Sequence, residues 1–342
     1  YTYRKSNRYN PYDVGYRSAV SSFKGLEECG FVMKRPGTHN LETGEQYQAR
    51  IQMTAKLWEL LVNDFSLGVE NFVGLNFGET IVLKNEKKQV VDYEETAQTI
   101  KMRKVLDRYN RLLSKADICM QDSGSSGEKK APAARYFRVF NNGSFEQGGR
   151  FYGPWWQGIS GDRRKSILIN GNATVELDYS AMHLHLLYGF EGLNYYTVFP
   201  EHDDPYILPG YGEYERKVLK YGMLLALNAK TKASGNGAIR KKLKEESLWQ
   251  KGLDLNGILE RFSEKHSAIA HYLYSSIGLK TQYEDACIAE YVIKKLTSRN
   301  VVCLCIHDSF IVEQAHEELL REMMIKGFKS RNLKSIPKIK VS

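Results

Sequence analysis

The chain has 342 residues, of which 42% are hydrophobic and 26% charged, and this composition excludes an intrinsically disordered protein. Its length allows a large core that is divided over two or more units. The formal net charge of +9 suits a polyanionic partner such as nucleic acid, although a basic surface can also serve solubility alone. No apolar run approaches the roughly 18 residues of a membrane span, so we expect no membrane partner.

The cysteines indicate a reducing compartment. Their number is odd, and their spacings match no zinc module and no disulfide framework. We therefore expect a cytoplasmic protein with free thiols. The five cysteines are Cys29, Cys119, Cys287, Cys303 and Cys305.

Residues 1–90 are predicted to form a small module. Apolar residues recur at helical spacing over 14–26, and Gly30 is a typical helix stop. Two strands are expected within 31–53, and Thr54 is a plausible N-cap for a following helix. This helix–hairpin–helix order resembles part of a winged-helix domain, but it also fits a small packing module with a basic turn. The candidate nucleic-acid contacts near the hairpin tip are Lys34 and Arg35.

Residues 91–134 combine a basic helix with a polar segment. The pattern over 94–118 predicts a helix that is basic on one side, which is usually a solvated face. Residues 121–134 are small and polar and favour a flexible loop. The basic residues of the helix are Lys101, Arg103, Lys104, Arg108, Arg111 and Lys115.

Two predicted strands end in aspartate. Residues 174–177 form a short strand that ends at Asp178, and the apolar run 301–304 leads to Asp308. Two strand-end carboxylates placed side by side can hold two divalent ions about 3.5–4 Å apart. A single strand-end aspartate can also do no more than cap a turn or a helix.

The predicted helix over 214–230 lies between the two aspartates in the sequence. Four residues recur every four positions and share one stripe of this helix. Two cations one turn apart can grip a triphosphate, and the next two positions can line a sugar and a base. The same pattern also fits a basic surface helix. The four residues are Arg216, Lys220, Leu224 and Asn228.

The order of aspartate strand, basic helix and His-Asp strand resembles motifs A, B and C of family A DNA polymerases and single-subunit phage RNA polymerases. "DYSAMH" resembles motif A, so Asp178 corresponds to the first metal-binding aspartate and Tyr179 to the residue that lends a backbone carbonyl to metal. "IHDSF" resembles motif C, with Asp308 as the second metal aspartate and His307 before it, near the nucleic acid.

The resemblance extends to two further segments. "RKVLKYGMLLALNA" resembles the motif B helix, which implies that Arg216 and Lys220 grip the triphosphate and that Lys220 can assist the leaving group. "GGRF" and "WWQGIS" resemble the ends of a segment that faces the primer-template upstream of motif A. The residues implied to contact nucleic acid there are Arg150, Gln157 and Arg163.

The resemblance implies an α+β fold with a right-hand arrangement. Residues 135–342 would form a palm with an antiparallel sheet and helical fingers, and 91–134 would contribute a thumb. Two Mg²⁺ ions, or Mn²⁺ in their place, would support transfer of nucleoside triphosphates onto a DNA or RNA template-primer. Two other classes stay open: a two-metal nuclease, which needs no triphosphate helix, and a non-catalytic DNA-binding replication initiator.

Four positions depart from the DNA polymerase pattern. His183 replaces a glutamate, Asn228-Ala229 replaces a Tyr-Gly pair and Ser309 replaces a second glutamate. His183 and Asn228 can both hydrogen-bond to a ribose hydroxyl. We therefore predict that ribonucleotides are used at least as well as deoxynucleotides, as in an RNA polymerase or primase of a mobile element, with a DNA polymerase as the alternative.

Overall fold

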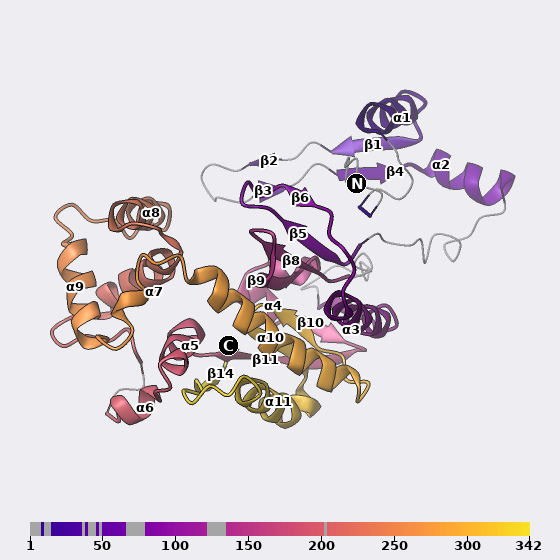
Figure 1. Cartoon of the computed structure of the whole chain (residues 1–342). Coiled ribbons are helices and arrows are strands. Elements are labelled where there is room, and N and C mark those ends of the chain that lie inside the picture. The colour runs from indigo at the N-terminus through magenta and orange to yellow at the C-terminus, as the bar shows by residue number, and fades with distance from the viewer. Residues whose placement is uncertain are drawn as a thin grey trace. The chain divides into compact units, whose positions relative to one another are not determined.

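The computed structural model describes residues 8–9, 15–35, 38–39, 46–47, 50–65, 79–121, 135–201 and 204–342. The chain forms two compact units, Tyr1–Glu79 and Thr80–Ser342, with elements labelled in Figure 1. This division differs from the predicted boundaries after residues 90 and 134, because the first strand and the first helix beyond Glu79 pack within the second unit. The first unit holds nine basic and nine acidic residues, so the net charge of +9 belongs to the second.

In the described residues of the first unit, the helices α1 and α2 flank the antiparallel β1–β4 ribbon. Gly30 has φ +71° directly after the first helix, and Oγ1 of Thr54 accepts a hydrogen bond from the Leu57 amide at 3.4 Å. Both predicted end signals are therefore confirmed. Its elements are α1 (Tyr16–Glu28), β1 (Val32–Arg35), β2 (Thr38–His39), β3 (Gln46–Tyr47), β4 (Arg50–Met53), α2 (Ala55–Glu59) and a π-helical turn (Leu60–Asp64).

The predicted contacts of this unit lie on β1, which pairs with β4 in antiparallel register. Lys34 is exposed on that strand. The side chain of Arg35 lies outside the described residues, although its backbone belongs to β1.

The second unit contains two sheets. The first has the order β6-β5-β8-β9, and only its β5–β8 pair is parallel. The second has the order β12-β13-β11-β10-β7 with β14 also paired to β11, and all its pairs are antiparallel. The strands are β5 (Ile81–Lys84), β6 (Val90–Val91), β7 (Ile118–Met120), β8 (Phe137–Asn141), β9 (Ser144–Tyr152), β10 (Ile167–Ile169), β11 (Asn172–Tyr179), β12 (Leu304–Ile306), β13 (Ser309–Glu313) and β14 (Ile339–Val341).

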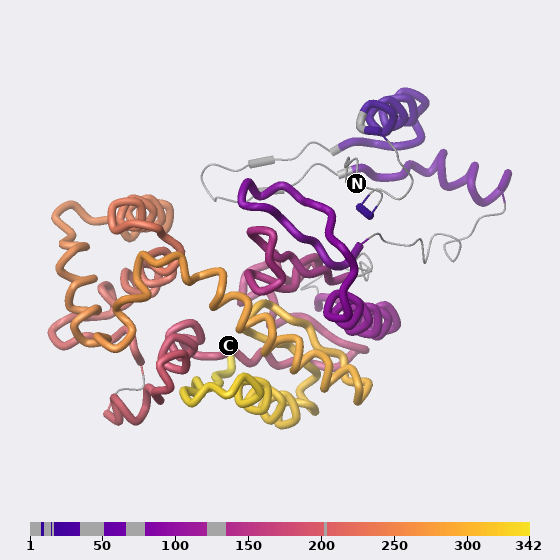
Figure 2. The backbone as a smooth tube through the Cα atoms, viewed as in Figure 1, coloured from indigo at the N-terminus to yellow at the C-terminus, as the bar shows by residue number. Residues whose placement is uncertain are grey.

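Helices alternate with groups of strands along the sequence of this unit. The fold therefore mixes helices and sheets, as the sequence predicts. Figure 2 shows the chain leaving the second sheet after β11, passing through α5–α9 and returning along the long α10 to β12. No helix of the described ranges is long and apolar enough to cross a membrane. The helices are α3 (Ala97–Leu113), α4 (Gly161–Arg164), α5 (Met182–Phe190), α6 (Tyr195–Val198), α7 (Glu213–Asn228), α8 (Lys232–Glu245), α9 (Leu255–Lys265), α10 (Gly278–Thr297) and α11 (Glu317–Lys329), with 3₁₀ turns at Trp155–Gly158, Ala270–Tyr272 and Gln314–His316.

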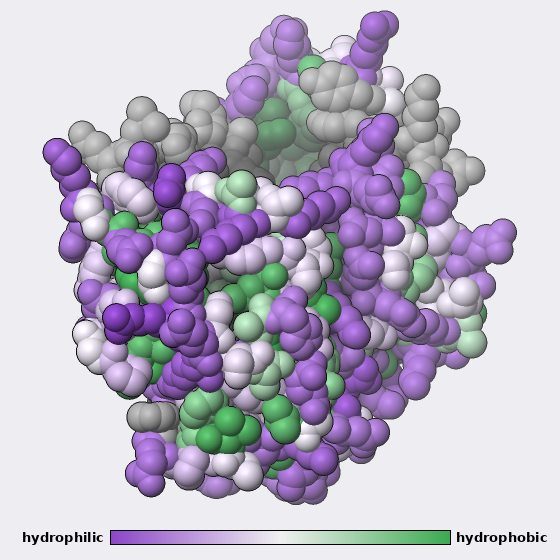
Figure 3. All heavy atoms as spheres, turned by 60° about the vertical axis from the view of Figure 1, so that its left-hand side comes forward, coloured by the Kyte–Doolittle hydropathy of each residue, from purple (hydrophilic) through white to green (hydrophobic). Residues whose placement is uncertain are grey.

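Apolar side chains gather in two clusters within the second unit. The sheet core joins β8–β13 to α3, α10 and α11, and the helical core joins α5–α9. Figure 1 shows α7–α9 at one end of this unit and α3 at the other. The face drawn in Figure 3 is mostly hydrophilic, and its apolar residues form small separate patches. Most large apolar side chains on this side of the protein are therefore buried beneath the surface.

Two tyrosine hydroxyls, one on α3 and one directly before β8, donate to carbonyls at the start of the β12 segment. Tyr109 on α3 donates to the Cys303 carbonyl at 2.5 Å, and Tyr136 donates to the Cys305 carbonyl at 2.6 Å. The indole of Trp156 donates to the Tyr136 hydroxyl at 2.7 Å. Because these groups are buried, leaving one unpaired is costly, so they hold β12 in one position.

The β8–β9 hairpin needs glycine at two places. Asn142 and Gly143 both have positive φ, which is the type I′ turn that matches strand twist. Gly149 has φ +79°, and a Cβ there would lie 2.6 Å from the Phe140 ring. The strand can therefore bend closely over Phe140 only with glycine at this position.

Two histidines outside the motifs pack in the core, and a third lies on the surface. His185 and His266 are fully buried, whereas His271 is exposed. Nε2 of His266 lies 2.9 Å from the Pro205 carbonyl, and Nδ1 lies 2.8 Å from the Tyr188 hydroxyl. Since a carbonyl only accepts, Nε2 carries a hydrogen. Burial lowers the pKa of His266 to about 4.

We expect His266 to lower the free energy of unfolding as the pH decreases from about 7 to about 5, because the unfolded chain binds a proton that the buried ring excludes, whereas the raised pKa of Asp178 acts in the opposite direction. The lowered pKa of His185, also about 4 through burial, acts in the same direction as that of His266. Urea unfolding at several pH values measures the slope. His266→Gln should make it shallower, and the exposed His271→Gln should not. Equal slopes in all three proteins would contradict this account.

Candidate active site

The two predicted metal aspartates lie at one end of adjacent strands. Asp178 is the penultimate residue of β11, and its ladder partner on β13 is Ser309. Asp308 precedes Ser309 in the two-residue turn between β12 and β13. The Tyr179 amide lies 3.4 Å from the Asp308 carbonyl. The antiparallel register thus brings together two residues that are far apart in sequence.

Negative charge accumulates at this end of the sheet. Burial raises the pKa of Asp178 to about 7, and the charges of Asp308 and Glu176 add to the effect. Lys220 and Arg164 oppose it, which also shows that the Lys220 charge lies near the carboxylates. A half-buried carboxylate beside a second one disfavours its own ionisation unless a cation is added.

Tyr179 contributes its backbone rather than its side chain. Its hydroxyl donates to the Met324 carbonyl at 2.6 Å, and its ring packs against Phe310 and Phe328. The side chain is therefore fully used in the core. Only its main-chain carbonyl is a candidate ligand, as the motif implies.

His307 begins the turn that carries Asp308. It has φ +58°, a left-handed conformation that is uncommon for residues other than glycine. Its ring packs edge-on against Tyr152, with centroids 5.3 Å apart. Burial, together with the charge of Arg150, lowers the pKa of His307. Nδ1 is buried and has no hydrogen-bond partner among the described residues.

A buried ion pair stabilises the two strands that adjoin the aspartates. The Arg164 guanidinium holds Glu176 with two hydrogen bonds of 2.8 Å. The Ser309 hydroxyl donates to the same carboxylate at 2.7 Å. Glu176 therefore links β11 to β13 beside Asp178. Sequence reasoning missed this role, although Glu176 shares a face of β11 with Asp178 by strand alternation.

A second buried network connects three elements. Asp285 on α10 forms an ion pair with Arg150 on β9, whose Nε lies 2.9 Å from Oδ2. His183 on α5 lies 3.2 Å from the same carboxylate and 3.1 Å from the guanidinium. Burial opposes the charge on Arg150, but Asp285 outweighs it and raises the pKa of Arg150. Sequence reasoning missed Asp285, whose only signal is an acidic residue on the apolar face of α10.

The other two residues expected near the primer-template differ in whether their side chains are already hydrogen-bonded within the protein. The Gln157 amide donates to the carbonyls of Phe151 and Cys305 at 2.9 and 3.0 Å, so it braces β12. Arg163 is exposed and makes no side-chain hydrogen bond or ion pair with the described part of the chain. Arg163 is thus available to a ligand, whereas the Gln157 amide is occupied.

The predicted triphosphate residues lie along α7 but are not equivalent. Nε of Arg216 lies 2.7 Å from Asp204, and its guanidinium also contacts Glu213 at 3.3 Å. Lys220 is exposed and has no ion pair with described residues. Leu224 is half-buried, and Nδ2 of Asn228 donates to its carbonyl at 2.7 Å. Of the two cations, only Lys220 is free to meet an anion without breaking a bond.

Asp285→Asn should lower the free energy of unfolding by roughly 3 kcal/mol, because it leaves the Arg150 charge buried without its counter-ion. The two side chains are 16% and 1% exposed. The double variant Arg150→Met/Asp285→Asn should recover part of the loss.

The matched control is Asp162→Asn, whose side chain is 95% exposed beside Lys165; it should cost about 0–1 kcal/mol. Urea unfolding followed by tryptophan fluorescence measures all of these proteins. Equal small losses for Asp285→Asn and Asp162→Asn would show that the buried pair gives no net stabilisation.

Comparisons with known proteins place these observations in context. No protein-family model matches the chain, and no curated protein matches it. Among solved structures, the chain is similar to the POL domain of Pol1 from M. smegmatis in complex with DNA primer-template and dNTP, with 12% identity and a TM-score of 0.40. The match covers 72% of this chain and 51% of that one, so the chain spans about half the length of this relative. Within the described residues, no group of three or more His, Cys, Asp or Glu side chains is arranged to hold a metal ion.

Proposed function

We propose that the chain is a nucleotidyltransferase of the polymerase type. The observation that carries this proposal is the pair Asp178 and Asp308 on adjacent strands, with Lys220 near enough for its charge to lower the pKa of Asp178. A negative site beside a free cation suits a metal-bound triphosphate, because each charge then has a partner. The second sheet would be the palm and α7–α9 the fingers.

The donor set fits Mg²⁺ or Mn²⁺. Two carboxylates and the Tyr179 carbonyl are hard oxygen ligands, which these ions prefer. Burial, and after it the charge of Asp308, raises the pKa of Asp178, and a bound cation would favour the ionised carboxylate. Bound divalent ions would stabilise the charge that develops on the phosphate oxygens.

The reaction would be attack of a primer 3′-hydroxyl oxygen on the α-phosphorus of a nucleoside triphosphate, with release of pyrophosphate. Lys220 would hold the leaving phosphates, and Arg216 would join it by exchanging Asp204 for phosphate. Leu224 would pack against the incoming nucleotide. The Arg164–Glu176–Ser309 contacts would keep the two aspartate strands in place without touching the substrate.

The template-primer would meet the chain at several exposed or paired groups. Arg163 is exposed and available to phosphate, and His307 lies in the turn that also carries Asp308. Arg150 would face the nucleic acid from a position that Asp285 fixes. The first unit, with Lys34 exposed on β1, would add a winged-helix-like contact to nucleic acid. Because the net charge of this unit is zero, it would contribute less than the second unit to the electrostatic attraction of the phosphates. Because α3 buries its apolar face in the sheet core, we propose no separate thumb.

Two rival functions use fewer of these features. A two-metal nuclease needs the aspartates but not a cation beside them. A non-catalytic replication initiator needs neither the aspartates nor the cation, so this function does not explain why negative charge accumulates at the strand ends. The proximity of Lys220 therefore favours triphosphate chemistry.

Asp178→Asn and Asp308→Asn should each lower nucleotide incorporation by about a thousandfold or more, because each removes a charged ligand from the same site. Affinity for a primer-template should change little. The assay combines the full chain, Mg²⁺ or Mn²⁺, a labelled primer-template and nucleotides of both sugars, and the exposed Asp117→Asn is the control. Near-normal incorporation by either site variant would reject the proposal, and metal-dependent cleavage without incorporation would favour the nuclease.

The sugar preference is a separate prediction. His183 and Asn228 already have partners within the chain, so the argument for ribose rests on the absence of the glutamate and tyrosine that exclude a 2′-hydroxyl. We expect ribonucleotides to be incorporated at least as well as deoxynucleotides. Single-nucleotide incorporation on one template measures the ratio. A preference for deoxynucleotides of about a hundredfold, or roughly 2.7 kcal/mol, would reject ribose use and leave the polymerase proposal intact.

A further inference from the structure

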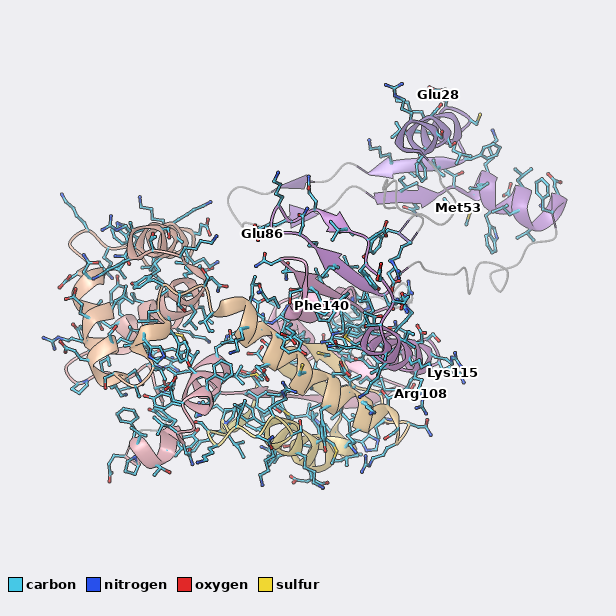
Figure 4. The ribbon with its side chains drawn as sticks, in the orientation of Figure 1. Glu28, Met53, Glu86, Arg108, Lys115 and Phe140 are labelled. Atoms are coloured by element: carbon cyan, nitrogen blue, oxygen red, sulfur yellow. The ribbon has the colours of Figure 1, made fainter. Side chains whose placement is uncertain are left out.

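Five cations form a straight stripe on α3 and the turn that follows it. Their spacings of three, four, three and four residues place them on one face of the helix. All five side chains are exposed. Figure 4 labels two of them, Arg108 and Lys115, which point away from the body of the sheet. The α3 stripe consists of Lys101, Lys104, Arg108, Arg111 and Lys115.

The opposite face of α3 makes the stripe rigid. Its buried side chains belong to the sheet core, and Tyr109 donates to the Cys303 carbonyl. Asn110 exchanges two hydrogen bonds with the Tyr136 backbone, at 2.8 and 2.9 Å. A ligand would therefore meet charges that are already in line and would not have to order the backbone that carries them.

The stripe lacks the acidic partners that other surface helices of this unit have. On α8, Lys242 pairs with Glu246, and on α11 Arg321 and Lys326 pair with Glu317 and Glu322. No member of the α3 stripe forms an ion pair with any residue that the structure describes. Arg103 is the contrasting case on α3, because it lies off the stripe and is held by Glu95.

Unpaired like charges at these spacings repel one another and weaken the helix. The acidic Asp107 lies beside the stripe and forms no ion pair with it or with other described residues. A partner with regularly repeated negative charge would remove the repulsion. The stripe extends about 21 Å at 1.5 Å per residue, and one nucleic-acid strand carries about six phosphates over that axial length.

We propose that the α3 stripe binds the phosphate backbone of duplex nucleic acid outside the candidate active site. The partner's identity rests on the proposed polymerase function, whereas the alignment, exposure and lack of ion pairs do not. Figure 1 shows α3 at the end of the second unit away from α7–α9. The stripe would therefore hold duplex without contacting the incoming nucleotide, and it would do so without reading base sequence.

The test uses two variants of the full chain with equal net charge. The stripe variant is Lys104→Gln/Arg108→Gln/Arg111→Gln. The control is Lys294→Gln/Lys329→Gln/Lys334→Gln, which removes three exposed cations elsewhere in the same unit. Fluorescence anisotropy with a labelled duplex gives Kd over a series of salt concentrations. The midpoint of thermal unfolding shows whether each variant is folded.

The stripe variant should bind duplex at least tenfold more weakly at low salt, and its log Kd should depend on log salt with a slope smaller by about two to three. The control should change Kd less than threefold. The stripe variant should unfold at an equal or slightly higher temperature, because repulsion has been removed.

If log Kd depends equally on log salt in the stripe variant and in the control, the inference is overturned, and the stripe is only a solvent-exposed face of α3. Weaker binding to polyglutamate with unchanged duplex affinity would also overturn it, in favour of an acidic protein partner. Incorporation on saturating short primer-template separates this test from that of the active site. It should survive in the stripe variant and disappear in Asp178→Asn, so either proposal can fail alone.

Discussion

The register between β11 and β13 is the constraint on which the candidate site depends. It sets Asp178 beside Ser309 and hence beside the turn that carries Asp308. A slip of one residue would turn every side chain of one strand to the other face and separate the two carboxylates. The Ser309–Glu176 hydrogen bond and the pairing of β14 with the end of β11 both favour the observed register.

The surrounding core resists the repulsion that this register creates. Two carboxylates beside each other in a half-buried position favour separation, so β12 and its turn must be held from the other side. The hydroxyls of Tyr109 and Tyr136 and the Gln157 amide all donate to carbonyls of Cys305 in β12 or of Cys303 directly before it. These bonds are made by side chains from α3, from the residue before β8 and from the turn after β9, so the position of Asp308 depends on three separate segments.

The positive surface charge and the negative strand ends lie in different parts of the second unit. The second unit has all of the formal net charge of +9, yet its strand ends collect negative charge at Asp178 and Asp308. A polyanion is drawn to the basic surface, whereas the acidic strand ends can meet a phosphate only together with a cation. The α3 stripe and Lys220 lie on different elements of this unit, so the duplex and triphosphate contacts that we propose are separate.

The sequence alone determined the local features of this protein. The strand-end aspartates, the helix that carries Lys220 and the Thr54 cap all follow from patterns within a few residues. Only the tertiary structure decided the partners: Asp285 meets Arg150 across 135 positions, and Glu176 meets Ser309 across 133. It also showed that Arg216 is already paired and that α3 packs with the sheet. Periodicity gives the face on which a side chain lies, but it does not specify which distant element packs against that face, because that choice is made by the core as a whole.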